Sequence, residues 1–373
     1  MTNPSHDASS RLAFLDWTRG VAALIMLQGH VFHSFTLKEL RSDGAYVISQ
    51  FIGGITPAVF LFLTGVTLAF LMESRERKGL PGRARVFAAL RRSAYLFALA
   101  YLFRLQMWLF GWPSSPWTDL LRVDILNCMG LSVAVLSLMA LFSTTERIRL
   151  CATLGLAIAA ASPLVSALDW SQTPGWIKSY LAPDYRAFSF FPWGAFVAFG
   201  VSAGSILRTV SRTDMHRVMQ WSALLGFGLV LSGQYFSNIP YSLYSNSEFW
   251  LNSPGLIVIK VGVILLMLAF AFLWNQQASA QGWSFVRQLG TTSLLVYWVH
   301  IELVYGRWLA SWKYALTVGQ TVAASVGVVL LMIGLSTLQV KWRQRPSGMK
   351  AADWLRTLAA RRPVAVTQRV SGD

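Results

Sequence analysis

The sequence predicts an all-α, polytopic integral membrane protein with about ten transmembrane helices and with both the N- and C-termini in the cytoplasm. Apolar residues make up 54% of the 373 residues and charged residues only 13%, whereas roughly a quarter of a typical soluble domain is charged. The apolar residues fall into runs of about 20, each long enough to cross a hydrocarbon core as a helix. The basic residues gather in short clusters beside these runs. We therefore interpret the formal charge of +16 as a topology signal and not as a nucleic-acid-binding surface.

Ten hydrophobic segments are expected to span the membrane, separated by connectors with turn-forming residues such as Pro81, Gly82 and Pro113. No internal repeat is visible. We assign residues 1–345 to one multi-pass domain and residues 346–373 to a basic cytoplasmic tail. The ten segments cover residues 12–35, 51–72, 86–110, 122–142, 149–168, 190–207, 218–236, 255–274, 286–305 and 316–340.

The distribution of Lys and Arg gives the orientation. With a cytoplasmic N-terminus, 22 basic residues lie on the inside and seven on the outside, which is the bias of the positive-inside rule and requires an even number of spans. The first segment contains Asp16 and Arg19 and ends without a cleavage pattern, so no removable signal peptide is expected. Cys128 and Cys151 have neither zinc nor disulfide spacing, and no metal site or resident cofactor is predicted.

Ionisable side chains inside the first segment point to function, because such groups are costly within a membrane. Asp16 and Arg19 are three residues apart and can pair on one helix face. Arg19 and His30 are eleven residues apart, so a helix returns them to nearly the same face. Alternatively, Asp16 and Arg19 reach the cytoplasmic surface and His30 lies at the outer interface.

Further polar side chains are predicted at the depth of His30. Ser293, Tyr297 and His300 share a helix face, and Asp124 and Asn127 begin the fourth segment. We interpret Arg104 and Lys260 as counter-charges for Asp124 or Glu302; Glu302 and His33 could instead be interfacial. A shared water-accessible cavity is predicted around six side chains from five segments: His30, His33, Arg104, Asp124, Lys260 and His300.

A histidine at this depth indicates proton transfer, because imidazole titrates near neutral pH and a neighbouring polar group can fix its tautomer. The sequence contains no Gly-x-Ser-x-Gly nucleophile motif, no His-Glu-x-x-His metal motif and no P-loop. Direct general-base transfer is the chemistry that these residues favour.

Five stretches resemble a known superfamily. RLAFLDWTRGVAALIMLQGH, from Arg11 to His30, is similar to the opening of the transmembrane acyltransferases, in which ten residues separate an arginine from a histidine. The other four resemble the branch that contains heparan-alpha-glucosaminide N-acetyltransferase and its bacterial relatives. They are FLFLTG (60–65), RVDILNCMG (122–130), FPWG (191–194) with Gly200, and LGTTSLLVYWVH (289–300).

The resemblance implies a multi-pass enzyme that takes an acyl group from acyl-CoA on the cytoplasmic side and places it on a hydroxyl or amine, usually of a saccharide, on the far side. It implies that His30 is catalytic and that Arg19 supports the donor or the pore. The glucosaminide branch tends to carry asparagine at the position of His30 and its catalytic histidine further on. His30 and His33 therefore both remain candidates for the base.

The resulting site prediction has three groups of residues. The predicted catalytic residues are His30, His300 and Asp124. The predicted substrate-binding residues are Asp16, Arg19, His33, Asn127, Ser293 and Tyr297. Arg91 and Arg92 are predicted to bind acyl-CoA, although the basic cluster from Arg75 to Arg92 also serves topology.

The expected partners are acyl-CoA, with acetyl-CoA as the expected donor, a carbohydrate or glycoconjugate acceptor, and the lipids of a bacterial inner membrane. No nucleic-acid partner is expected. The alternative function is a transporter or flippase for a polar or glycolipid substrate, since intramembrane charges also mark substrate paths. The expected absence of repeats and of paired discontinuous helices argues for the enzyme.

Overall fold

The computed structural model describes residues 13–211, 213–241, 243–245, 247–277 and 282–344. These residues form α-helices and short 3₁₀ helices and contain no named strand, so the all-α prediction is confirmed. The predicted tail at 346–373 lies outside the described residues, and the division into a domain and a tail stays a prediction. The helices are α1 (Ala13–Phe35), α2 (Gly44–Gly53), α3 (Thr56–Arg77), α4 (Gly82–Gly111), α5 (Ile125–Leu136), α6 (Thr144–Ser166), α7 (Gly175–Leu181), α8 (Phe190–Thr209), α9 (Met215–Ser237), α10 (Pro254–Gln277), α11 (Phe285–Thr291), α12 (Ser293–Tyr305) and α13 (Val318–Arg343).

The chain is an integral membrane protein, because seven stretches within the described residues are long and apolar enough to cross a membrane. Helices also occupy the other three predicted segments, but α12 is a shorter apolar helix, and α1 and α9 are not among the seven stretches. The count of ten and the position of the termini therefore stay predictions. The seven stretches are Gly44–Arg77, Gly82–Gly111, Trp117–Leu141, Thr144–Ser166, Phe190–Thr209, Pro254–Gln277 and Val318–Arg343.

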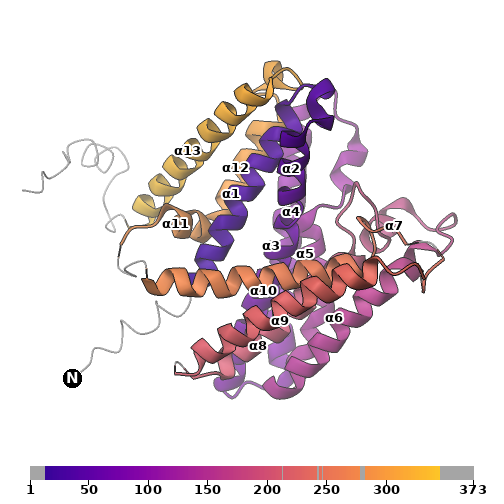
Figure 1. The fold of residues 1–373 in the computed structure, drawn as a ribbon, viewed down its shortest axis with the longest axis vertical. Helices are drawn as coiled ribbons and strands as arrows, with labels where there is room; N and C mark the ends of the chain where they lie inside the picture. The colour runs from indigo at the N-terminus through magenta and orange to yellow at the C-terminus, as the bar shows by residue number, and fades with distance from the viewer. Residues whose placement is uncertain (1–12, 212, 242, 246, 278–281, 345–373) are drawn as a thin grey trace, which may run out of the picture.

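The helices form two packed groups around two apolar cores (Figure 1). The larger core joins α3, α4, α5, α6, α8, α9 and α10, with α3 packed along α8 and α9 along α10. The smaller core joins α1, α11, α12 and α13. Its centre contains Leu27, Val31, Leu289, Val296 and Met332. Because α1 also contacts α2, α3 and α10, it connects the two groups.

The predicted continuous segment at 286–305 is wrong, because Thr292 separates α11 from α12 with backbone angles of φ −110° and ψ 15°. The Thr292 hydroxyl donates to the Gln288 carbonyl oxygen at 3.0 Å and lies 2.6 Å from the Ser336 hydroxyl, which holds the break against α13. The segment at 51–72 is likewise interrupted between α2 and α3 at Gly54. The prediction that discontinuous helices are absent is therefore wrong. Their expected absence can no longer be used as an argument against a transporter.

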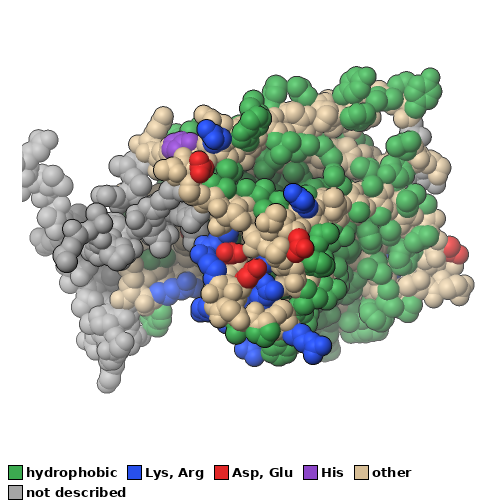
Figure 2. All heavy atoms as spheres, turned by 90° about the horizontal axis from the view of Figure 1, so that it is seen from below, with side chains coloured by type: hydrophobic (Ala, Val, Ile, Leu, Met, Phe, Trp, Pro, Cys, Tyr) green, Lys and Arg blue, Asp and Glu red, His purple; other side chains and the backbone are tan. Residues whose placement is uncertain are grey.

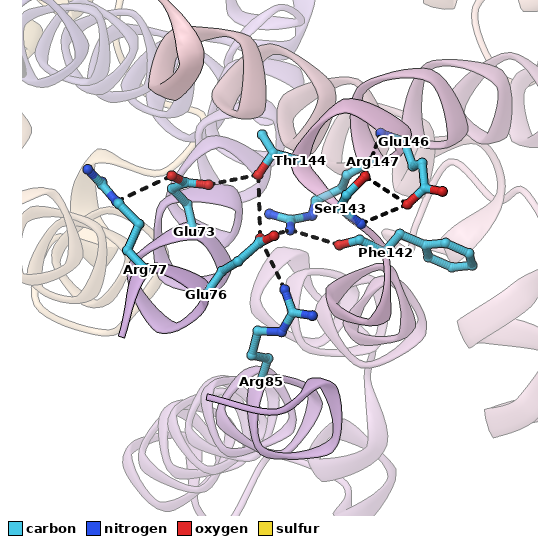
Figure 3. A network of polar contacts seen from close by, with 9 residues as sticks. All are labelled: Glu73, Glu76, Arg77, Arg85, Phe142, Ser143, Thr144, Glu146 and Arg147. Atoms are coloured by element: carbon cyan, nitrogen blue, oxygen red, sulfur yellow. Dashed lines mark hydrogen bonds and ion pairs between the residues drawn. The ribbon is translucent and has the colours of Figure 1, made fainter. Parts of the chain in front are cut away.

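An ionic network joins the ends of α3, α4 and α6 (Figure 3). The guanidinium of Arg147 is fully buried and donates to Glu76 at 2.6 Å, a structural contact that the count of basic residues did not predict. Arg85 pairs with the same carboxylate at 3.0 Å, and Arg77 pairs with Glu73 at 3.3 Å. Part of the basic cluster is therefore structural.

Charged side chains gather on one end of the molecule. Figure 2 shows Lys and Arg beside Asp and Glu on this end, while hydrophobic side chains cover much of the adjoining surface. Such a division between a polar end and apolar flanks is expected when the flanks contact lipid.

Candidate functional site

A cavity of about 2500 Å³ lies between α1, α2, α3, α4, α10 and α12. His30, His33, Arg104, Asp124 and Lys260 line it, so the predicted common cavity is confirmed for five of the six side chains. The sixth, His300, is fully buried directly behind His30.

Two histidines from the separate helices α1 and α12 are hydrogen-bonded at the cavity wall. The His30 Nδ1 atom lies 2.9 Å from the His300 Nε2 atom. The two rings are nearly parallel, with an interplanar angle of 12° and centroids 5.2 Å apart. The Tyr305 ring meets His30 edge-on at 5.5 Å and so restricts its rotation.

The hydrogen-bond network assigns the tautomers of this pair. The His300 Nδ1 atom lies 2.7 Å from the Val296 carbonyl oxygen, which can only accept, so Nδ1 carries the proton. In neutral His300, Nε2 is then an acceptor, and His30 must donate from Nδ1. Neutral His30 consequently has an unprotonated Nε2, the ring nitrogen available to a ligand in the cavity.

Asp124 was predicted to be catalytic, but its contacts among the described residues do not include His30 or His300. It is the N-cap of α5, where its Oδ1 atom accepts from the backbone nitrogens of Leu126 at 3.0 Å and Asn127 at 3.3 Å. Its Oδ2 atom lies 3.1 Å from Arg104 Nε, which confirms Arg104 as its counter-charge. Within the described residues, these contacts make Asp124 a positioning group for α5 and α4.

Asn127 and Asp16 form polar contacts with nearby residues and do not line the cavity. Asn127 completes the capping box of α5 and donates from Nδ2 to the Tyr180 hydroxyl at 2.9 Å. Asp16 accepts from Arg19 Nη1 at 2.9 Å, as the spacing predicted, and holds the guanidinium of Arg19 beside the cavity. Arg19 and His30 both line the cavity, so their predicted common face is confirmed.

Arg91 and Arg92 separate although they are adjacent in the sequence. Arg92 lines the cavity and lies close enough to Arg19 for their charges to interact. Arg91 lies over the exposed ring of Phe87, 5.4 Å from its centroid, and does not line the cavity. Of the two predicted donor-binding residues, only Arg92 lines the cavity, and its role in donor binding stays a prediction.

The other predicted substrate-binding residues lie at two levels of the cavity. Ser293 and Tyr297 line its wall next to the histidine pair, and the Tyr297 ring centre is 5.9 Å from that of His300. His33 is exposed at the rim, where its Nδ1 atom lies 3.3 Å from the Tyr46 hydroxyl. His300 orients His30 through a hydrogen bond, whereas His33 has a tyrosine hydroxyl as its neighbour in place of a second imidazole.

Lys260 is not the counter-charge that the sequence suggested. Its ammonium lies 5.0 Å from the centre of the Trp193 ring, and no ion pair joins it to a carboxylate in the part of the chain that the structure describes. Trp193 lies in the FPWG stretch and Tyr305 at the end of the ninth predicted segment, but neither was predicted as a site residue.

The lining of the cavity is strongly cationic. Seven described Lys and Arg side chains contribute to it, against the two carboxylates Asp124 and Asp184. No group of three His, Cys, Asp or Glu side chains with metal-site geometry occurs among the described residues. The cationic residues are Arg19, Arg92, Arg104, Arg122, Arg186, Lys260 and Lys313.

An imidazole pair within a bundle of apolar helices places the protein among multi-pass membrane proteins whose polar site lies inside the helical bundle. The chain belongs to the heparan-alpha-glucosaminide N-acetyltransferase catalytic family, whose family model matches residues 11–235, more than half of the sequence. The predicted resemblance is thus confirmed. His30, Arg92 and Asp124 lie inside the matched part, whereas Lys260 and His300 lie beyond it. A comparison with individually curated proteins gave no match.

Proposed function

We propose that this protein is a membrane-bound acyltransferase of a bacterial inner membrane. It transfers an acyl group, most simply acetyl, from cytoplasmic acyl-CoA to a hydroxyl or amine of a saccharide at the outer side. Membership of an N-acetyltransferase family supports the reaction class. The observation that carries the proposal is the His30–His300 hydrogen bond, which leaves His30 Nε2 free in a cavity that Arg19 and Arg92 also line.

In this proposal, His30 is the general base. Its Nε2 atom takes the proton as the acceptor oxygen or nitrogen attacks the thioester carbonyl. The tetrahedral intermediate collapses by breaking the carbon–sulfur bond, and the imidazolium returns the proton to the departing CoA thiolate. His300 accepts the hydrogen bond from His30 Nδ1 throughout, so it keeps the correct ring nitrogen directed toward the acceptor.

The donor and the developing oxyanion have separate supports. Arg92 and Arg19 bind the phosphates of acyl-CoA, because guanidinium groups match phosphate oxygens in charge and geometry. The Tyr297 and Ser293 hydroxyls stabilise the oxyanion beside the histidine pair. Asn127, which was predicted to bind substrate, donates from Nδ2 to the Tyr180 hydroxyl instead.

The second candidate is a transporter or flippase for a polar or glycolipid substrate. The interrupted helices α2–α3 and α11–α12 favour it, because helix breaks beside a cavity are typical of transport sites. A pathway for transport does not require a neutral imidazole pair with one free nitrogen, which is why we favour the enzyme.

Transfer from radiolabelled acetyl-CoA separates the two functions. The purified protein is incubated with labelled acetyl-CoA and glucosamine, which offers both an amine and hydroxyls, or with glucose as the hydroxyl-only acceptor. Labelled saccharide that depends on the protein and decreases in His30→Ala supports the acyltransferase. Uptake of saccharide into proteoliposomes without any acetylated product would support the transporter.

A further inference from the structure

Lys260 is a cation without a counter-ion inside an apolar helix. It lies on α10, on the same cavity wall as Leu256, Ile259 and Val263, and Trp193 lies against its ammonium. Two other cations that line the cavity are paired with carboxylates, Arg19 with Asp16 and Arg104 with Asp124. An uncompensated charge in a membrane span is costly, so a bound anion is the expected partner of Lys260.

The cavity also reaches the apolar flank of the protein. Val47, Phe51 and Ile52 of α2 line it although they are exposed by 52%, 67% and 44%. On the opposite side, Trp250 lines it and is exposed by 60%. The Phe51 and Trp250 rings meet edge-on with centroids 6.1 Å apart, so these two exposed side chains contact each other across this opening.

We propose that the acceptor is a saccharide carried on a phosphorylated lipid. Its alkyl chain enters between Phe51 and Trp250, its phosphate binds Lys260, and its sugar reaches His30. We infer the alkyl chain from the apolar opening of the cavity, and the phosphate from the Lys260 ammonium, which has no carboxylate partner. This inference rests on the proposed acyl transfer for the role of the sugar but not for the binding of the lipid phosphate.

The CoA donor also carries phosphates, so the experiment must distinguish the two sources of the anion. The probes are glucosamine 1-(hexadecyl phosphate), hexadecyl glucosaminide, which lacks the phosphate, and acetyl-CoA. Equilibrium binding is measured with protein in phosphatidylcholine nanodiscs, which needs no turnover. Acetyl transfer to the two saccharide probes is measured in parallel.

Lys260→Gln should raise the Kd of the phosphorylated probe by roughly 10- to 100-fold, because hydrogen bonds to charged groups are the stronger kind. Lys260→Arg should restore most of the affinity. The Kd values of hexadecyl glucosaminide and acetyl-CoA should stay unchanged in both variants. Lys178→Gln is the matched control, because Lys178 is exposed on α7 and does not line the cavity.

Two outcomes would overturn the inference. An unchanged Kd for the phosphorylated probe in Lys260→Gln would show that Lys260 binds no lipid phosphate. A raised Kd for acetyl-CoA alone would assign the anion to the donor. If the wild type binds the phosphorylated probe through Lys260 but transfers no acetyl group to any saccharide, the proposed function fails and the lipid site stands.

The opening is tested by joining its two sides. In Phe51→Cys with Trp250→Cys, a reducible bis-maleimide linker should slow binding of the phosphorylated probe, and cleavage of the linker should restore the rate. Cys128 and Cys151 are fully buried, so the linker has no competing exposed thiol among the described residues. Equal rates before and after cleavage would show that the lipid does not enter here.

Discussion

Removing His300 tests the assigned hydrogen-bond chain more specifically than removing His30 itself. In His300→Ala, the His30 Nδ1 atom loses the partner that lies 2.9 Å away and its N–H is left unpaired at the buried wall. Such a loss costs about 1–3 kcal/mol, which corresponds to roughly a 5- to 150-fold decrease in the rate constant for acyl transfer. Without His300, the neutral His30 ring can also adopt the tautomer that carries its proton on Nε2. That nitrogen can then no longer act as the base.

The two histidines should act as one unit. His30→Ala should lower the rate constant by about 10²- to 10⁴-fold, the usual contribution of a general base. The double variant should be no slower than His30→Ala, because His300 acts only through His30. His300→Gln, whose amide oxygen can accept from His30 Nδ1, should recover part of the rate.

Single-turnover acetyl transfer is the appropriate assay, because it separates the chemical step from substrate binding and product release. His216→Ala is the matched control, since His216 is an exposed histidine that contacts Gln276 away from the cavity. Independent, multiplicative losses in the double variant would refute the relay. A larger loss in His33→Ala than in His30→Ala would move the base to His33.

Three further predictions address the donor site, the ionic network and the topology. Arg92→Gln should raise the Michaelis constant for acetyl-CoA by about tenfold, whereas Arg91→Gln should leave it unchanged; equal effects in a steady-state assay would contradict the separation of these two side chains. Glu76→Gln should lower the free energy of unfolding by about 3 kcal/mol, because it leaves the fully buried Arg147 without its carboxylate. Glu39→Gln, at an exposed site, should leave the free energy of unfolding unchanged. Thermal unfolding in detergent measures both variants, and equal stability of the two would refute the structural role of Glu76. Cysteines at Ser171 and Ser245 should react with an impermeant thiol reagent from outside and one at Ser211 should not; the reverse labelling would overturn the orientation.

The sequence predicted the helices and the cavity from physical regularities that are local. Long apolar segments identified the long helices but not α7 or most of α2, and the eleven-residue interval placed Arg19 and His30 on one face. Costly charges inside apolar segments identified the cavity lining. The i,i+3 pair of Asp16 and Arg19 follows from helix geometry alone.

Features that depend on tertiary contacts could not be predicted in this way. The break at Thr292 depends on a hydroxyl contact with Ser336, which is 44 residues away. Asp124 was predicted to be catalytic, but its carboxylate accepts hydrogen bonds from backbone nitrogens of α5 and pairs with Arg104. Adjacent Arg91 and Arg92 looked equivalent in sequence, yet the rotation of about 100° per helical residue directs only one of them into the cavity.

Acyl transfer across the membrane shows whether the protein carries an acetyl group from cytoplasmic acetyl-CoA to a saccharide on the outer side through His30. Proteoliposomes are sorted for a single orientation, with labelled acetyl-CoA confined to the cytoplasmic face and glucosamine 1-(hexadecyl phosphate) supplied in the membrane with its sugar exposed on the outer face. Labelled acetyl-saccharide is expected on the outer face for the wild type, and about 10²- to 10⁴-fold less for His30→Ala. Transfer at the wild-type rate by His30→Ala, or acetylation confined to the cytoplasmic face, would contradict this expectation.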